Sequence, residues 1–243
     1  MPGFYRKFLD GTPYYLARHY WWAYLWRTGV WFFDHQPIIN AILFGQYERL
    51  MHTTLDQFSA QPAGRVLQLT CVYGQFTPRL LDKLPVGLDI ADVADVQLAL
   101  ARRKATELNQ APPLHAARMN AECLGYKSDT FDTIVLFFLL HEMPPEARAN
   151  TLSEAMRVLK PGGRMLITEY GATPHQHMLY RFPPSRWLLG WLEPFLPGFW
   201  QENLDDAMQR AAQGHGKAIH RSGSEENIFS GFYRVVTYQI NRA

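Results

Sequence analysis

The sequence has little cysteine, no long apolar run and almost no excess of charge. Its two cysteines, Cys71 and Cys123, form no closely spaced metal motif, and two thiols without an export signal are typical of a reducing, cytosolic setting. No apolar run approaches the roughly 20 residues that span a bilayer, and the N-terminus lacks the apolar core and cleavage site of a signal peptide. With 24 basic and 22 acidic residues, the chain is not expected to bind nucleic acid or another polyanion.

Aromatic residues are abundant, at 14% of the 243 residues, and the seven tryptophans all lie outside the middle of the chain. This distribution indicates an apolar cover for a pocket, or a surface that contacts lipid. The length fits one α/β domain with a terminal extension. We expect an aromatic helical extension over residues 1–60 and a cofactor-binding domain over 61–243, with a lid or membrane-contact insertion at 171–215. The tryptophans are Trp21, Trp22, Trp26, Trp31, Trp187, Trp191 and Trp200.

From residue 65 onward, short apolar segments alternate with segments of helical character. This alternation predicts an α/β fold with a doubly wound parallel sheet. Residues 133–140 are apolar throughout, as expected of a central strand buried on both faces. The pattern predicts strands at 65–69, 86–90, 114–118, 133–140 and 164–169, helices at 76–84, 92–108 with Asp92 as N-cap, and 145–159, and a turn at 161–163.

The flanking segments carry further expectations. Apolar side chains at roughly helical spacing predict helical structure over residues 34–58. Residues 187–200 are apolar but interrupted by Pro194 and Pro197, which fits either a lid or a segment lying in a membrane interface. We expect a helix at 201–213, a polar loop at 222–227 and an edge-region strand at 232–240.

Polar residues at the predicted strand ends form a candidate cofactor site. Ligands of doubly wound sheets bind beyond the carboxyl ends of the strands, where the strand order reverses. Asp89 can accept hydrogen bonds from both hydroxyls of a ribose, and the Asn120 amide can meet the edge of an adenine. The candidate cofactor contacts are Gln68, Thr70, Tyr73, Gly74, Asp89, Ile90, Asn120, Ala121, Glu122 and Phe137.

Residues 65–170 resemble the ubiquinone/menaquinone-biosynthesis C-methyltransferases. The likeness is carried by Asn120-Ala121-Glu122, Phe131-Asp132 and Leu159-Lys160-Pro161-Gly162-Gly163. It implies the Rossmann-like sheet of class I methyltransferases and S-adenosylmethionine (SAM) as cofactor. The first motif departs from the pattern, because Gln68 replaces an acidic residue and Thr70-Cys71-Val72-Tyr73 replaces a glycine-rich turn before Gly74.

This departure and the flanks resemble a narrower family, the methyltransferase-like rhodoquinone biosynthesis proteins. That resemblance implies replacement of a methoxy group of ubiquinone by an amino group, with SAM as amino donor and Mn²⁺ assisting. One departure is Trp26-Arg27, where a His-Pro pair is expected. The likeness is carried by His19-Tyr20-Trp21-Trp22-Ala23-Tyr24, by Cys71-Val72-Tyr73-Gly74 with Thr77-Pro78-Arg79-Leu80, and by Phe229-Ser230-Gly231-Phe232-Tyr233.

The altered first motif suggests a hypothesis about the amine. A nearby carboxylate raises the pKa of an ammonium group, and a chain α-amino group titrates near about 7.7–8.0. Gln68 in place of the carboxylate would therefore favour a neutral, nucleophilic amine; alternatively, Gln68 only hydrogen-bonds the turn. Tyr73 either presses on SAM and shifts its methyl group, or packs in a site that binds SAM loosely.

Residues near the ends of the fourth and fifth predicted strands are candidate metal ligands and catalytic groups. Manganese favours carboxylate and imidazole ligands, so His141, Glu142 and Glu169 form the candidate metal set, and His141 is also a catalytic candidate with Gln68 and Tyr73. Neighbouring residues on an extended chain point opposite ways, which favours one of His141 and Glu142 over both. The alternative is a loop histidine with solvated acids.

Aromatic residues are candidates to hold a quinone ring. These are Tyr20, Trp21, Trp22, Tyr24 and Tyr170; alternatively, those of the extension pack it onto the sheet. A polyprenyl quinone resides in the bilayer, so we expect a cytoplasmic protein peripheral on the inner membrane. Three functions stay open: amino transfer to ubiquinone, a C- or O-methyltransferase acting on a quinone or lipophilic phenol, and a non-catalytic quinone-binding protein.

Overall fold

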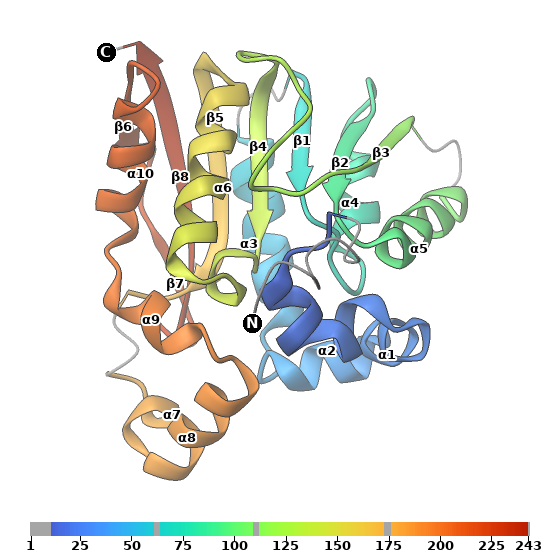
Figure 1. Cartoon of the computed structure of the whole chain (residues 1–243), viewed down its shortest axis with the longest axis vertical. Helices are drawn as coiled ribbons and strands as arrows, with labels where there is room; N and C mark the ends of the chain where they lie inside the picture. Colours follow the sequence, from blue (N-terminus) through green and yellow to red (C-terminus); the bar gives the residue numbers. More distant parts are fainter. Residues whose placement is uncertain (1–10, 61–63, 109–111, 173–175, 243) are drawn as a thin grey trace.

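A single mixed sheet forms the centre of the protein. The computed structural model describes residues 11–60, 64–108, 112–172 and 176–242. Its eight-stranded sheet has the order β3-β2-β1-β4-β5-β8-β6, with β7 paired to β8 off this path (Figure 1). The strands are β1 (Val66–Leu69), β2 (Leu88–Asp92), β3 (Leu114–Arg118), β4 (Phe131–Phe137), β5 (Leu159–Tyr170), β6 (Lys217–Arg221), β7 (Glu226–Ile228) and β8 (Tyr233–Arg242).

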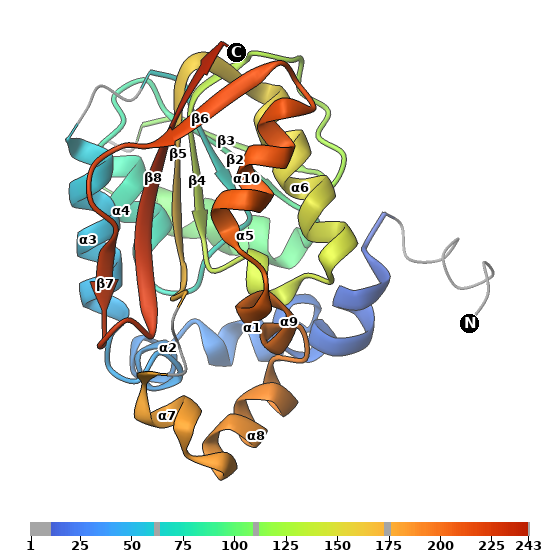
Figure 2. The ribbon, with the colours of Figure 1, turned by 90° about the vertical axis from the view of Figure 1, so that its left-hand side faces the viewer.

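Five parallel strands and their helices give the predicted doubly wound arrangement. β1 pairs in parallel with β2 and β4, β2 with β3, and β4 with β5, while β8 runs antiparallel to β5. Helices α3 (Tyr47–Ser59) and α4 (Phe76–Asp82) cover one face, and α6 (Pro145–Val158) and α10 (Leu204–Gln213) cover the other (Figures 1 and 2). The predicted α/β fold class is confirmed.

Six short helices gather beyond the carboxyl ends of the parallel strands (Figures 1 and 2). Three come from the N-terminal extension and three from the segment between β5 and α10, so parts of the chain far apart in sequence meet at one end of the sheet. They are η2 (Leu16–Leu25), a π-helix, with α1 (Arg27–Phe33), α2 (Gln36–Ile42), α7 (Met178–Arg181), α8 (Pro183–Leu192) and α9 (Leu196–Gln201).

The helical character expected over residues 34–58 is divided between α2 and α3. The helix is interrupted between α2 and α3, where Phe44 and Gly45 adopt positive φ values of 51° and 77°. The break turns α3 back along the sheet, where it buries Leu50, Met51 and Leu55. The apolar spacing is helical on both sides, so the pattern alone did not reveal the break.

Four further expectations about strands and loops need correction. β2 ends at Asp92 rather than at residue 90, so Asp92 belongs to the strand and α5 (Asp95–Thr106) has Ala94 as its N-cap. β8 is an internal strand between β5 and β6, and part of the expected polar loop at 222–227 forms β7. The expected turn at 161–163 lies inside β5, opposite a register shift in β4.

Tyr47 of α3 holds the turn after β1. Its hydroxyl donates to the carbonyl of Tyr73 (3.1 Å) and accepts from the backbone N–H groups of Gln75 (2.7 Å) and Phe76 (2.9 Å). These donors lie at the start of α4, where helix N–H groups have no partner within the helix. Gly74 has a φ of +74°, and a Cβ atom there would lie 2.5 Å from the hydroxyl. Gly74 therefore preserves the contact.

Replacing Tyr47 by Phe is expected to lower the free energy of unfolding by about 2–4 kcal/mol, because two buried backbone groups and one partly buried group lose their partner. Urea unfolding of Tyr47→Phe measures this loss. Tyr14→Phe is the matched control, since Tyr14 is exposed. Equal stability of the two variants would contradict a structural role for the Tyr47 hydroxyl.

Candidate active site

The smaller of two adjoining cavities has the position of a nucleotide site. It encloses about 70 Å³. Part of its wall consists of residues that end or follow four neighbouring parallel strands, where doubly wound folds bind their ligands. Thr70 and Cys71 follow β1, Asp92 ends β2, Asn120 and Ala121 follow β3, and Leu139 and Glu142 follow β4. Another part comes from the N-terminal extension, through Pro13, Tyr15, Leu16 and Tyr24.

Asp92, not Asp89, is the carboxylate at this cavity. Asp92 accepts hydrogen bonds from the backbone N–H groups of Cys71 and Ala94, each at 2.7 Å. Burial raises its pKa to about 6, although these hydrogen bonds oppose the shift. Asp89 instead pairs with Arg65 through two 3.0 Å hydrogen bonds. The expectation for Asp89 is wrong because β2 continues three residues beyond it.

The other cofactor candidates divide between the cavities and the protein interior. Thr70, Asn120 and Ala121 line the smaller cavity, whereas Phe137 lines the larger one. Three further candidates, Ile90, Gly74 and Glu122, line neither cavity. Ile90 is buried in a small apolar cluster, Gly74 packs on Tyr47, and Glu122 accepts a hydrogen bond from Asn150.

Gln68 lies beneath the turn and lines neither cavity. Its Nε2 donates to the Thr70 carbonyl and to the Thr77 hydroxyl, both at 2.9 Å. The side chain is fully buried, and its Oε1 atom has no hydrogen-bond partner among the described residues. The structure thus gives Gln68 a role in holding the turn, and its effect on a cofactor amine stays a prediction.

The larger cavity, of about 200 Å³, is mainly apolar and aromatic. Of the five residues expected to hold a ring, Tyr20, Trp22, Tyr24 and Tyr170 line it, whereas Trp21 is 51% exposed and does not. The two cavities adjoin along a shared wall. That wall consists of Tyr24, Cys71, Phe138 and Glu142.

Tyr73 joins the first-motif turn to the N-terminal extension. Its hydroxyl donates to the Ala23 carbonyl, and its ring stacks on that of Tyr24 at 5.6 Å between centroids and 11° between planes. Tyr73 lines the larger cavity and not the smaller one. The structure therefore places Tyr73 in the wall of the larger cavity instead of that of the smaller one.

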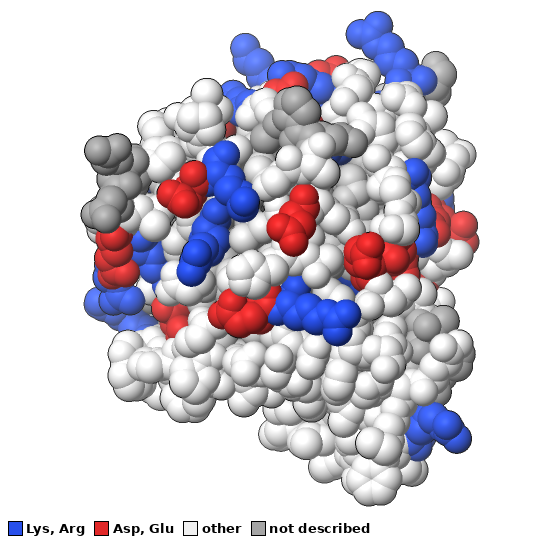
Figure 3. Space-filling view, turned by 180° about the vertical axis from the view of Figure 1, so that it is seen from behind, with Lys and Arg blue, Asp and Glu red and all other residues white. Residues whose placement is uncertain are grey.

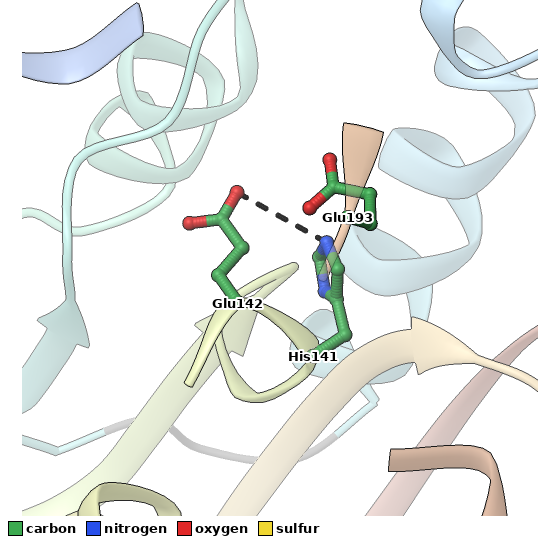
Figure 4. Close-up of side chains that lie close together, drawn as sticks. All are labelled: His141, Glu142 and Glu193. Atoms are coloured by element: carbon green, nitrogen blue, oxygen red, sulfur yellow. Dashed lines mark ion pairs between the residues drawn. The ribbon is translucent and has the colours of Figure 1, made fainter. Parts of the chain in front are cut away.

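Three side chains at the edge of the larger cavity form a candidate cation site. One nitrogen of His141 and one oxygen each of Glu142 and Glu193 lie within 4.8 Å of one another. His141 Nε2 is 4.0 Å from Glu142 Oε1, and Figure 4 shows the three side chains converging on one space. His141 and Glu142 both reach it because they lie in the 3₁₀ turn η3 (Leu140–Glu142), not on an extended strand.

Glu169 lies behind this cluster, so its assignment as a metal ligand needs correction. Glu169 is fully buried and its Oε2 lies 2.9 Å from His141 Nδ1, while its Oε1 accepts from the Leu140 N–H at 2.7 Å. A carboxylate on one ring nitrogen orients the other toward a metal. Glu193 provides the third group instead. It is the one charged residue within 187–200, a signal that the sequence interpretation missed.

Two tyrosines of the π-helix cover the cluster. Tyr24 donates to Glu142, and Tyr20 donates to Glu193 at 2.9 Å. A π-helix closes its hydrogen bonds five residues apart, as between the Trp26 N–H and the Trp21 carbonyl, and such turns are frequent at functional sites. The wide turn brings residues 20 and 24 to the same side.

The electrostatics of the cluster suit a divalent cation. Burial and the neighbouring Glu193 raise the pKa of Glu142 to about 8, although His141 opposes the shift. Burial alone would lower the pKa of His141, but Glu169 raises it to about 9. At neutral pH these raised pKa values leave protons on Glu142 and His141, which a bound cation would displace. The two carboxylates and the imidazole would then form a set that Mn²⁺ favours, and the cation would offset the repulsion between the carboxylates. The residues therefore fit the metal implied by the resemblance.

The raised pKa of Glu142 predicts a pH-dependent stability. A carboxyl group that holds its proton more tightly when folded loses stability as the pH rises from about 4.5 to about 8. In the presence of a chelator, Glu142→Gln is expected to unfold at a higher temperature than the wild type at pH 8, with little difference at pH 5. Thermal unfolding across this range measures the effect. If the unfolding temperature of both proteins changed equally with pH, the raised pKa of Glu142 would be contradicted.

Comparison with known proteins agrees with this architecture. Residues 66–163 match the family model described as a methyltransferase domain. The chain is 33% identical over 138 residues to demethylmenaquinone methyltransferase of Lactiplantibacillus plantarum, covering 56% of this chain and 57% of that protein. It is 31% identical over 136 residues to the ubiquinone/menaquinone biosynthesis C-methyltransferase UbiE of Pasteurella multocida, covering 55% and 50%. The matches thus span about half the length of these relatives.

Solved structures show the same fold at low sequence identity. The cyclase SpnF superposes with a TM-score of 0.59 and 17% identity, covering 89% of this chain and 97% of that one. Magnesium protoporphyrin IX methyltransferase of Synechocystis, with bound SAH, gives a TM-score of 0.56 and 13% identity, covering 80% and 83%. The protein thus has the Rossmann-like fold of class I methyltransferases. Its residues 66–163 match a methyltransferase domain, and the chain is similar to ubiquinone/menaquinone C-methyltransferases over about half the length of those proteins.

Proposed function

We propose that the chain replaces a ring methoxy group of ubiquinone by an amino group taken from SAM, as in rhodoquinone biosynthesis. The observation that carries this proposal is the His141–Glu142–Glu193 cluster, which lies where the two cavities adjoin. Displacement of methoxy by an amine requires an electron-poor ring carbon, and a cation beside a quinone oxygen would withdraw electrons from the ring. The net reaction breaks the ring C–O bond to the methoxy group and the Cα–N bond of SAM, and forms a ring C–N bond. The methoxy group leaves as methanol, and the remainder of SAM, having lost a proton from its Cβ atom, leaves as an alkene.

The smaller cavity would hold the nucleoside part of SAM. Asp92 would accept hydrogen bonds from the ribose hydroxyls, and Asn120 lies where the adenine edge is expected. The sulfonium and amino-acid end would then lie toward Tyr24, Cys71 and Glu142, which also border the larger cavity. SAM would supply the nitrogen there, and Gln68 adds no negative charge that would keep this amine protonated.

The larger cavity would hold the quinone ring among aromatic side chains. Tyr24 and Tyr73, stacked on one another, and Phe138 border the cavity and exclude water. His141, Glu142 and Glu193 would hold Mn²⁺ beside the ring, where it would polarise a carbonyl oxygen. Glu169 would keep the Nε2 atom of His141 directed at the cation.

Labelled SAM tests the proposal directly. The purified protein is incubated with a short-tail ubiquinone, Mn²⁺ and SAM carrying nitrogen-15 in its amino group, and the quinone is analysed by mass spectrometry. We expect a product that carries the heavy nitrogen in place of a methoxy group. A quinone that gains a methyl group, or one that is unchanged while SAM binds, would overturn amino transfer.

Methyl transfer to a quinone or lipophilic phenol is the second candidate. The identity of 31% to a quinone C-methyltransferase over 55% of this chain favours it. SAM labelled in its methyl group distinguishes the two reactions, because the label enters the quinone only in methyl transfer. A protein that binds quinone and leaves both labels in SAM would instead be a non-catalytic binding protein.

A further inference from the structure

Helices α7 and α8 carry apolar side chains that nothing in the described chain covers. α8 buries only Leu189, although eight of its ten residues are proline, tryptophan, leucine or glycine. The other two are Ser185 and Arg186. Both helices lie at the end of the molecule remote from the chain's C-terminus (Figures 1 and 2). The exposed apolar residues of this segment are Met178, Phe182, Trp187, Leu188, Trp191 and Leu192.

The N-terminal helices add a second set at the same end. Here the exposed apolar residues are Trp21, Trp26, Trp31, Phe32, Ile42 and Phe44. Together the two sets form what we call the aromatic face. Among the described residues, the only exposed large apolar side chains outside it are Tyr14 and Val86. An apolar surface so concentrated marks an interaction site.

The aromatic face borders the larger cavity on two sides. Ile42 and Leu192 line this cavity, yet they are 43% and 40% exposed. One belongs to α2 and the other to α8, so the cavity opens between the two halves of the face. Whatever covers the face therefore also covers the entrance.

The charges on these helices have one sign. In the described residues from 16 to 44 and from 178 to 192, the exposed charged side chains are Arg18, Arg27, Arg181 and Arg186. The single acid, Asp34, is turned inward to Lys104. Figure 3 shows the same end of the molecule almost free of charge, with acids and bases mixed over the opposite end. Exposed tryptophans and arginines on the same helices match the interface of an anionic bilayer.

We propose that the aromatic face docks on an anionic lipid bilayer, with α8 lying in the plane of the interface. No helix of the described chain is long and apolar enough to cross a membrane, so the contact is confined to one leaflet. Docking places the cavity entrance against the leaflet. If the proposed function holds, a lipophilic quinone enters the cavity without passing through water. The docking proposal depends on the aromatic face and not on the proposed reaction.

Vesicle sedimentation without SAM or quinone tests the docking. Wild-type protein is expected to bind vesicles of phosphatidylcholine and phosphatidylglycerol, and to bind pure phosphatidylcholine much more weakly. Trp187→Gln/Trp191→Gln is expected to lower the partition coefficient about tenfold or more. Val86→Gln is the control, since Val86 is exposed but outside the face. Circular dichroism verifies that the variants fold.

The arginines are tested separately. Arg181→Gln/Arg186→Gln is expected to weaken binding to anionic vesicles by about fivefold per charge, because each arginine near the surface contributes electrostatic attraction. Arg49→Gln/Arg103→Gln removes the same charge from exposed positions outside the face and should bind like the wild type.

Two results would overturn the proposal: wild-type protein that stays in solution with anionic vesicles, and protein that buries the face in a dimer, detected by light scattering, without binding vesicles. Both measurements are independent of turnover. Vesicle binding without an aminated product would therefore refute the proposed function and leave the docking surface intact.

Discussion

Glu193→Gln is expected to lower quinone turnover by about 100- to 1000-fold, because it removes a charge placed where the reacting ring and a cation would meet. The substitution keeps the size of the side chain, and its amide oxygen can still accept the hydrogen bond from Tyr20. Glu193 does not line the smaller cavity, so the affinity for SAM should stay within about twofold of the wild type. Steady-state kinetics and calorimetry with SAM measure the two quantities.

The dependence on Mn²⁺ makes this test specific to the cluster. The variant should need more Mn²⁺ for half-maximal activity, since one of three ligand groups is neutralised. Glu146→Gln is the matched control, because Glu146 is exposed on α6. A Glu193→Gln protein that keeps the wild-type rate and Mn²⁺ dependence would show that the reaction takes place elsewhere.

Asp92→Asn is expected to weaken SAM binding by about 100-fold, because hydrogen bonds from the ribose to a carboxylate are charge-assisted. Asp89→Asn should change SAM affinity by less than about twofold, since its partner Arg65 is half exposed and such pairs contribute little. The chain thus provides its own control, three residues away on the same strand. Calorimetric titration of both variants with SAM decides between them.

The pH dependence of SAM binding supports the same assignment. The Asp92 pKa is raised to about 6 by burial, so the wild-type carboxyl group gains its proton as the pH falls below that value. SAM affinity should therefore decrease between pH 7 and pH 5 in the wild type and stay nearly constant in Asp92→Asn. A stronger loss of affinity in Asp89→Asn than in Asp92→Asn would return the ribose contact to Asp89.

The alternation of apolar and helical segments was sufficient to predict the parallel part of the fold. Buried strands such as β4 produce continuous apolar runs, and a run of this kind is visible without any partner. The position of β8 was not visible, because its antiparallel insertion between β5 and β6 depends on pairing with strands distant in sequence. The break at Phe44 and Gly45 was hidden for a different reason: the apolar spacing continues across it.

Two signals in the sequence predicted residues of the site: positions shortly after strands, and the aromatic residues Tyr20, Trp22 and Tyr24 of the N-terminal extension. Thr70, Asn120 and His141 lie at strand ends, and strand ends meet at one edge of a parallel sheet. The choice between Asp89 and Asp92 depended on where β2 ends, which periodicity fixes poorly. Glu193 comes from a separate helical segment and joins the cluster through tertiary packing alone.

The shared wall of the two cavities has a thermodynamic consequence. Tyr24 and Glu142 border both spaces, and Tyr24 is held by its stack on Tyr73. A ligand that fills either space restricts the motion of these side chains, so the second ligand meets a wall already ordered and loses less conformational entropy on binding. Such coupling is reciprocal: SAM and the quinone would raise each other's affinity by the same factor.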